Sequence, residues 1–145
     1  MTTGRSSRIA MMLTAVGLAT AGCVQAHGDT APAKVASVAV PPDGGPAIVT
    51  LNPAAEKRLD VQTAEVKQGQ FGLLIPYSAV IYEADGSSWA YVRTEPETYQ
   101  RSPIAISTIT GDEVALTSGP LAGTQVVTVG AAELVGVEIG IDGEE

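Results

Sequence analysis

The sequence has few of the residues from which catalytic and metal sites are most often built. Its 145 residues include one cysteine, Cys23, one histidine, His27, and three methionines, at positions 1, 11 and 12. A single cysteine excludes an intramolecular disulfide. A catalytic triad needs its histidine in a packed site, and His27 lies in a stretch of small residues. Without later methionines, the thioether ligands of monovalent copper are missing. We therefore expect no enzymatic activity, no bound metal and no cofactor.

Basic residues are also scarce, with 8 Lys and Arg against 16 Asp and Glu, a formal net charge of −8. Every charged residue after Arg101 is acidic. An acidic surface repels phosphate backbones, so nucleic acid is not expected as a partner. The simplest interpretation of the acidity is that it keeps the domain soluble.

Long apolar runs are absent except near the N-terminus. There, Arg5 and Arg8 precede the apolar segment Ile9 to Ala21. This segment is shorter than the roughly 20 residues that a helix needs to cross a hydrocarbon core of ~30 Å. The pattern therefore predicts a signal peptide, residues 1–22.

The lone cysteine directly follows that segment, which resembles the lipobox of bacterial lipoproteins. Thr20 stands where that motif usually has leucine. The resemblance implies lipidation of Cys23, a stable membrane anchor and a location in the cell envelope, on the periplasmic side. The alternative is an ordinary secretory signal cut near Ala21 or Ala26.

The composition divides the rest of the chain into a tether and a folded domain. Residues 23–46 are rich in Ala, Pro and Gly and predict a flexible tether. Residues 47–145 form the predicted domain, and the acidic tail 139–145 is expected to fray.

Within that domain, short strand signals alternate with turns. Asn52 as N-cap and Pro53 at the first position predict a short helix that ends at Leu59. The apolar runs Ala79 to Tyr82 and Trp89 to Val92 flank Asp85-Gly86, a strong hairpin signal. Further strands are expected at 48–51, 61–66, 99–107, 114–116 and 125–129, with Pro103 marking an edge or a bulge. The β-branched run 125–129 should be central, and Val114 and Leu116 should share a buried face. Residues 67–70 are expected in a turn or loop, the hairpin loop should exceed two residues, and 131–134 should form a helical turn. We expect an all-β barrel or roll of six to seven strands.

The stretch Ile75 to Thr94, which contains the hairpin, holds the only tryptophan and three of the four tyrosines. Cross-strand packing of these aromatics is the preferred interpretation, with ligand binding as the alternative. Acids around the hairpin form either a cation patch or, more simply, solvated loops; they are Glu83, Asp85, Glu95 and Glu97. His27 and Asp29 are likewise interpreted as solvated rather than metal-binding.

Nine short motifs occur in an order and spacing found in a known family. They are 49–51 (VTL), 59–64 (LDVQTA), 75–80 (IPYSAV), 85–86 (DG), 89–92 (WAYV), 99–104 (YQRSPI), 111–116 (GDEVAL), 118–123 (SGPLAG) and 126–131 (VVTVGA). Over roughly residues 48–138 the sequence resembles the membrane-proximal domain of periplasmic adaptor subunits. These are the membrane fusion proteins of resistance-nodulation-division (RND) efflux pumps, and the resemblance is closest to their heavy-metal branch.

The chain departs from those adaptors between Val66 and Ile75, which only residues 67–74 connect. A full adaptor has a lipoyl-like domain, usually an α-helical hairpin, and a β-barrel domain at this point. The family uses the lipoyl-like domain and the hairpin to reach the outer-membrane channel, so this chain is not expected to bridge two membranes.

The resemblance implies a lipid-anchored accessory protein that docks on an inner-membrane transporter of the efflux type, without catalysis. The candidate partner contacts are Tyr77, Asp85, Trp89, Tyr99 and Arg101. The alternative is a free-standing lipoprotein that binds a small ligand or a cation, because a fold does not fix a function. A third possibility is a truncated gene product with no role.

Overall fold

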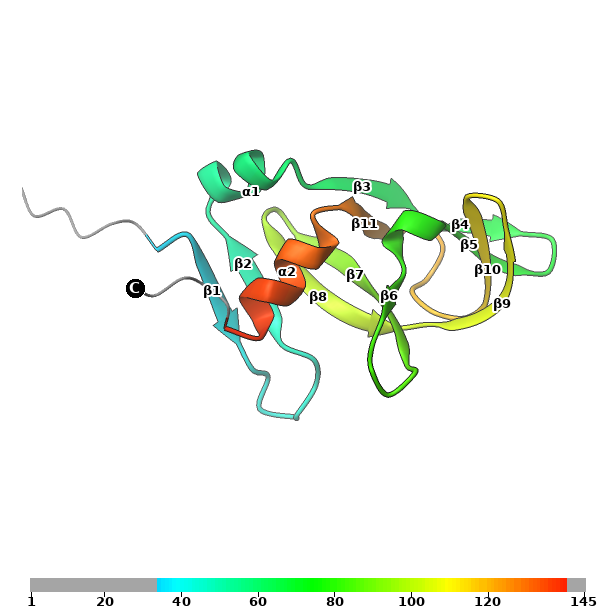
Figure 1. Ribbon diagram of the computed structural model, residues 1–145, viewed down its shortest axis with the longest axis horizontal. Helices are drawn as coiled ribbons and strands as arrows, with labels where there is room; N and C mark the ends of the chain where they lie inside the picture. Colours follow the sequence, from blue (N-terminus) through cyan, green and yellow to red (C-terminus); the bar gives the residue numbers. More distant parts are fainter. Residues whose placement is uncertain (1–33, 141–145) are drawn as a thin grey trace, which may run out of the picture. The chain divides into compact units, whose positions relative to one another are not determined.

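The computed structural model describes residues 34–140, in which the chain forms eleven β-segments, two α-helices and one 3-10 turn (Figure 1). The prediction of a mainly β fold is confirmed, whereas the predicted six to seven strands are too few. All strand pairs are antiparallel, and they form one seven-stranded and one four-stranded sheet. Neither sheet closes on itself among the described residues, so the predicted barrel is not confirmed.

The seven-stranded sheet has the order β1-β2-β8-β7-β11-β3, and β6 pairs with β7 beside this path. Its strands are β1 (Ala36–Ala39), β2 (Ile48–Leu51), β3 (Gln62–Glu65), β6 (Ile81–Tyr82), β7 (Ser88–Glu95), β8 (Thr98–Pro103) and β11 (Gln125–Val129). The predicted central position of 125–129 is confirmed, because β11 pairs with β7 on one side and β3 on the other.

The four-stranded sheet has the order β4-β5-β10-β9. Its strands are β4 (Lys67–Gly69), β5 (Gly72–Pro76), β9 (Ala105–Thr110) and β10 (Glu113–Ser118). Its edge strand β9 is irregular, because Thr108 pairs with Ala115 and Ile106 with Leu116, which leaves Ser107 without a partner in β10. Such a β-bulge bends the strand and increases its local twist.

The chain passes from one sheet to the other at four places, and at two of them the connection is a single buried residue. Val66 separates β3 from β4, and Ile104 separates β8 from β9. The N–H of Val66 donates to the carbonyl of Thr124 at 2.8 Å, and the N–H of Gly123 donates back to Val66 at 2.8 Å. Pro103 ends β8 beyond Gln100, the last residue there that pairs with β2. Its missing N–H is therefore not needed by β2, which explains how a proline fits beside a central strand.

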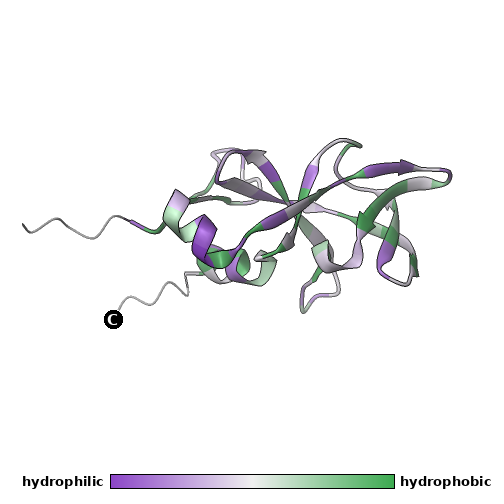
Figure 2. Cartoon of the chain, turned by 90° about the horizontal axis from the view of Figure 1, so that it is seen from above, coloured by the Kyte–Doolittle hydropathy of each residue, from purple (hydrophilic) through white to green (hydrophobic). Residues whose placement is uncertain are grey.

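Two hydrophobic cores lie on opposite faces of the seven-stranded sheet, because neighbouring residues of a strand point to opposite sides. Tyr91 and Val127 belong to the core that also holds residues of the two helices. Ala90 and Val126, one position earlier, belong to the core shared with the four-stranded sheet. The residues predicted at the buried face of β10, Val114 and Leu116, lie in this second core. Figure 2 shows that both hydrophobic and hydrophilic stretches occur along the strands.

Helix α1 (Pro53–Leu59) follows its predicted signals. The side chain of Asn52 accepts a 2.7 Å hydrogen bond from the N–H of Ala55, and Pro53 occupies the first turn. Helix α2 (Ala131–Glu138) is longer than the single turn suggested by 131–134. It starts after Gly130, whose φ of 90° favours glycine. No helix among residues 34–140 is long and apolar enough to cross a membrane.

The N-terminal boundary of the domain differs from the prediction. β1 lies inside the predicted tether and pairs with β2 from Ala36↔Leu51 to Ala39↔Ile48. Ala36 is buried in the first core. Composition misled the prediction here, because small residues that look like linker can still supply a complete set of backbone hydrogen bonds to a neighbouring strand.

Two further local predictions were wrong. Residues 67–69, expected in a turn, form β4, and Ala79, expected at the start of the first hairpin strand, ends the 3-10 turn η1 (Tyr77–Ala79). The predicted hairpin itself is present as β6 and β7, and its loop is longer than two residues, as expected.

Candidate functional site

The β6–β7 loop presents Asp85 to solvent. The carboxylate of Asp85 accepts a 2.8 Å hydrogen bond from the N–H of Ser87. Hydrogen bonds from the side chain and the backbone of Ser87 lower the pKa of Asp85 below its usual value. The loop is closed by backbone hydrogen bonds from Glu83 to Ser87 and from Gly86 to Glu83, both 3.0 Å. Asp85 therefore offers a fixed negative charge at the hairpin tip.

Two tyrosines lie exposed at the start of the same hairpin. Tyr77, on η1, is 45% exposed and Tyr82, on β6, is 52% exposed. Partial burial and then the neighbouring Tyr77 raise the pKa of Tyr82 above its usual value. The two side chains thus lie close to one another on the surface.

Trp89 and Arg101 are brought together from neighbouring strands. The guanidinium of Arg101 lies 5.2 Å from the centre of the Trp89 ring, a cation–π distance. Arg101 also pairs with Glu83, in the hairpin loop, and with Glu138 at 2.8 Å. Both predicted contact residues are half-buried and already engaged within the chain.

Tyr99 is wholly buried, so it is not accessible as a contact residue and the prediction is corrected. Its hydroxyl donates to the carboxylate of Glu56 on α1. Arg93 pairs with the same carboxylate at 2.8 Å, and its guanidinium lies 6.0 Å from the centre of the Tyr99 ring. Tyr99 therefore attaches a helix to the sheet.

A second set with the same chemistry attaches α2. The hydroxyl of Tyr91 donates a 2.5 Å hydrogen bond to Glu138, whose carboxylate also pairs with Arg101. Cross-strand pairing of Tyr91 with Arg101, and of Arg93 with Tyr99, places all four side chains on the helix-covered face of the sheet. We call these two sets of residues the tyrosine–glutamate–arginine triads. Neither triad is predicted from the sequence, in which no local motif relates Glu56, Glu138 or Arg93 to the tyrosines.

The triads shift the ionisation of their tyrosines. Burial raises the pKa of Tyr91 far above its usual value of 10.0, and the hydrogen bond and charge of Glu138 add to this. Burial, followed by the hydrogen bond and charge of Glu56, likewise raises the pKa of Tyr99. Both phenols stay protonated and act as donors over the physiological range.

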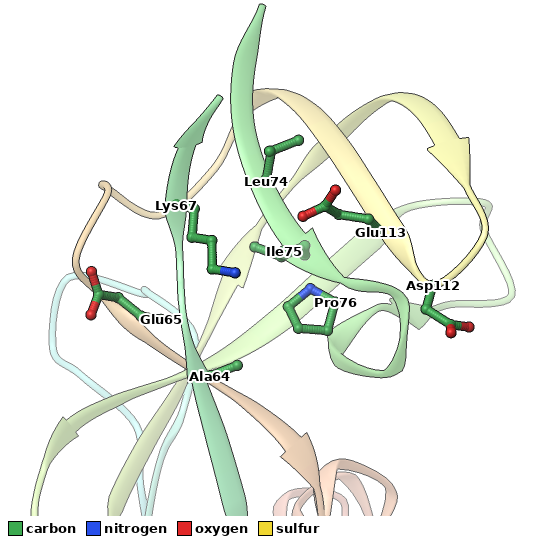
Figure 3. A pocket seen from close by; sticks show the side chains of 8 residues that line it. All are labelled: Ala64, Glu65, Lys67, Leu74, Ile75, Pro76, Asp112 and Glu113. Carbon is green, nitrogen blue, oxygen red and sulfur yellow. The ribbon is translucent and has the colours of Figure 1, made fainter. Parts of the chain in front are cut away.

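A cavity of about 320 Å³ lies beside β3, β4 and β5 (Figure 3). Its lining consists of Ala64, Glu65, Lys67, Leu74, Ile75, Pro76, Asp112 and Glu113. Lys67 and Glu113 extend toward the cavity from the strands on either side of β5, whereas Asp112 points away. No ion pair joins Lys67 to Glu113 within residues 34–140. The cavity therefore presents a cation and an anion beside an apolar floor.

The acidic residues around the hairpin do not form a cation site. Glu83 and Asp85 lie before β7, and Glu95 and Glu97 lie at its far end. In the described part of the chain, no group of three His, Cys, Asp or Glu side chains is placed to hold a metal ion. Cys23, with its predicted lipid, and the signal peptide 1–22 lie outside the described residues, as do His27 and Asp29.

Comparison with known proteins adds no assignment: no family model matches the sequence, and a search of curated proteins finds no match. The resemblance to adaptor subunits stays a prediction from sequence motifs.

Proposed function

We propose that this chain is a non-catalytic docking domain, anchored to a membrane through Cys23, that binds the outward face of an efflux-type inner-membrane transporter. The order and spacing of the adaptor-like motifs over roughly residues 48–138 motivate the proposal. In it, the two open sheets correspond to the all-β domain that the strand and turn pattern predicts. The single-residue junctions at Val66 and Ile104, each of which links one sheet to the other, are compatible with that correspondence.

One observation supports the docking role most directly: Tyr77 and Tyr82 are exposed, and the loop that follows Tyr82 carries the fixed charge of Asp85. Tyrosine is enriched in protein interfaces because it combines apolar area with a polar group. Of the other candidate contacts, Tyr99 and Arg101 belong to the triads, and Trp89 packs against Arg101. The docking surface is accordingly defined by Tyr77, Tyr82 and Asp85.

Affinity purification tests the proposal. A tagged full-length chain, extracted with detergent from its native membrane, is expected to recover an inner-membrane transporter. The double substitution Tyr77→Ala and Tyr82→Ala is expected to abolish recovery. Leu121→Ala, which removes an 80% exposed apolar side chain elsewhere, is the matched control and should have no effect. Recovery that is unaffected by the tyrosine substitutions contradicts the proposed surface.

The membrane anchor needs a separate test. A fatty-acid analogue should label the wild-type chain and should not label Cys23→Ala. Label retained on Cys23→Ala would show that the lipid is attached at another residue, and no label on the wild-type chain would contradict the anchor.

A free-standing ligand-binding lipoprotein is the second candidate, favoured by the cavity of Figure 3. Its facing Lys67 and Glu113 suit a small ligand that carries both charges. Calorimetry with zwitterionic amino acids and with divalent metal ions distinguishes the two candidates. Tight binding that Lys67→Gln and Glu113→Gln both weaken would favour the ligand-binding function.

A further inference from the structure

A second cavity, of about 250 Å³, lies where β1, the end of β2, α1 and α2 meet. Its lining consists of Val35, Ala36, Leu51, Ala55, Arg58, Leu59 and Val137. Ala36, Leu51 and Ala55 are buried and belong to the first core. The cavity is thus an apolar hollow that reaches the core, and Arg58 is the only charged residue of its lining.

Hydrogen bonds fix the walls of this cavity. The N–H of Asn52 donates to the carbonyl of Val35 at 2.9 Å, and its side-chain amide donates to Lys34 at 3.1 Å. Because Asn52 also caps α1, the start of β1 and the first turn of the helix are held together. Ala55, Arg58 and Leu59 follow the three- and four-residue spacing that places them on one face of that helix. A site with such fixed walls loses little free energy to ordering when a ligand binds.

The charge of Arg58 is not neutralised by an ion pair within residues 34–140, where the ion pairs involve Arg93 and Arg101. The acids closest to it in sequence have other partners. Glu56 binds Arg93 and Tyr99, and Asp60 accepts a 2.9 Å hydrogen bond from Gln62. An arginine beside an apolar hollow favours a ligand that combines an aliphatic chain with a carboxylate, because a guanidinium can bind a carboxylate with two parallel hydrogen bonds.

We propose that this cavity binds a medium-chain aliphatic carboxylate, with its hydrocarbon chain among the apolar residues and its carboxylate on Arg58. The volume limits the chain length. At ~30 Å³ for each water-sized group, the cavity holds roughly eight non-hydrogen atoms, about the chain of octanoate. The inference does not depend on the proposed docking function, which uses the surface around Tyr77.

Titration of the full-length Cys23→Ala chain, which carries no lipid of its own at that position, tests this inference. Octanoate is the probe, and the methyl signals of Val35, Leu51, Leu59 and Val137 in NMR spectra report binding. We expect saturable shifts of these signals with a dissociation constant of roughly 0.1–1 mM. Each methylene removed from the ligand should weaken binding about fourfold, equivalent to ~0.8 kcal/mol, so butyrate should bind far more weakly.

Two variants separate the role of the charge from general electrostatics. Arg58→Gln should weaken octanoate binding about fivefold to tenfold and should leave the binding of octanol, which has no carboxylate, unchanged. Lys57→Gln removes the neighbouring positive charge, which does not line this cavity, and should have no effect on octanoate binding. Equal loss in both variants, shifts confined to other residues, or no saturation below about 5 mM octanoate would overturn the proposal.

Discussion

The hydroxyl of Tyr91, in the middle of β7, donates a 2.5 Å hydrogen bond to the carboxylate of Glu138, the last residue of α2. The Glu138 side chain is only 8% exposed and is also paired with Arg101. One carboxylate thereby joins the C-terminal helix to two strands of the seven-stranded sheet. Helix α1 is attached in the same way by Glu56, with Tyr99 and Arg93 in the corresponding positions.

Removing the Tyr91 hydroxyl should loosen α2. Tyr91→Phe keeps the ring in the core and deletes one hydrogen bond to a charged acceptor. We expect the free energy of unfolding to fall by about 1.5–3 kcal/mol, measured by urea unfolding. Amide hydrogen exchange should increase first in residues 131–138. Glu133→Gln, on an exposed position of the same helix, is the control and should change stability by less than about 0.5 kcal/mol.

The triad of Tyr99, Glu56 and Arg93 should behave as a coupled unit. In a double-mutant cycle of Tyr99→Phe and Glu56→Gln, we expect the combined loss of stability to be smaller than the sum of the single losses. The coupling should be about 0.5–3 kcal/mol, since the two side chains are in direct contact. Additive single effects would show that the hydrogen bond contributes nothing beyond the separate residues. The same cycle between Tyr99 and Glu138, which belong to different triads, is the control.

Stability should decrease at alkaline pH. The pKa values of Tyr91 and Tyr99 are raised in the folded state, so the folded chain holds these protons more tightly than the unfolded chain does. Their contribution is fully present below the unfolded value of about 10 and falls as the pH rises above it. Urea unfolding between pH 8 and pH 11 should show this decline, and Tyr91→Phe combined with Tyr99→Phe should flatten it. A decline that is unchanged in the double variant would assign the effect to other groups.

Strand β1 should be necessary for the domain, although it lies in the stretch of sequence that looks like a tether. Ala36→Asp places a charge in the first core, so we expect a loss of more than about 3 kcal/mol or failure to fold. Ser37→Asp, on the exposed neighbouring position, should change stability by less than about 0.5 kcal/mol. Equal effects in thermal unfolding would show that β1 is not packed as described.

Local signals identified part of the fold. The helix starting at Pro53 was predictable because Asn52 and Pro53 act on the backbone within one turn, and the hairpin because Asp85-Gly86 lies between two apolar runs. β1 was missed because its composition is that of a linker, whereas its structure depends on backbone pairing with β2. The length of α2 was missed because it has no side-chain cap at its start.

The triads were not predictable for a different reason. Tyr91 and Glu138 are 47 positions apart, and Tyr99 and Glu56 are 43 apart. No spacing rule for helices or strands relates residues so distant in the chain, so each side chain had to be interpreted alone. Tyr99 and Arg101 were predicted as partner contacts, whereas their hydrogen bonds and ion pairs within the domain could not be foreseen.

The bulge at Ser107 has a consequence for solubility. β9 is an edge strand of six residues without a charged or proline side chain, and Ile109 is 47% exposed. A flat strand of this kind would be a template on which other copies of the chain could stack into fibrils. The extra residue breaks the regular alternation of N–H and carbonyl groups along the free edge, so a copy in extended form cannot match it over its whole length. In this chain a backbone irregularity protects the edge strand, as lysine or proline side chains do on many other edge strands.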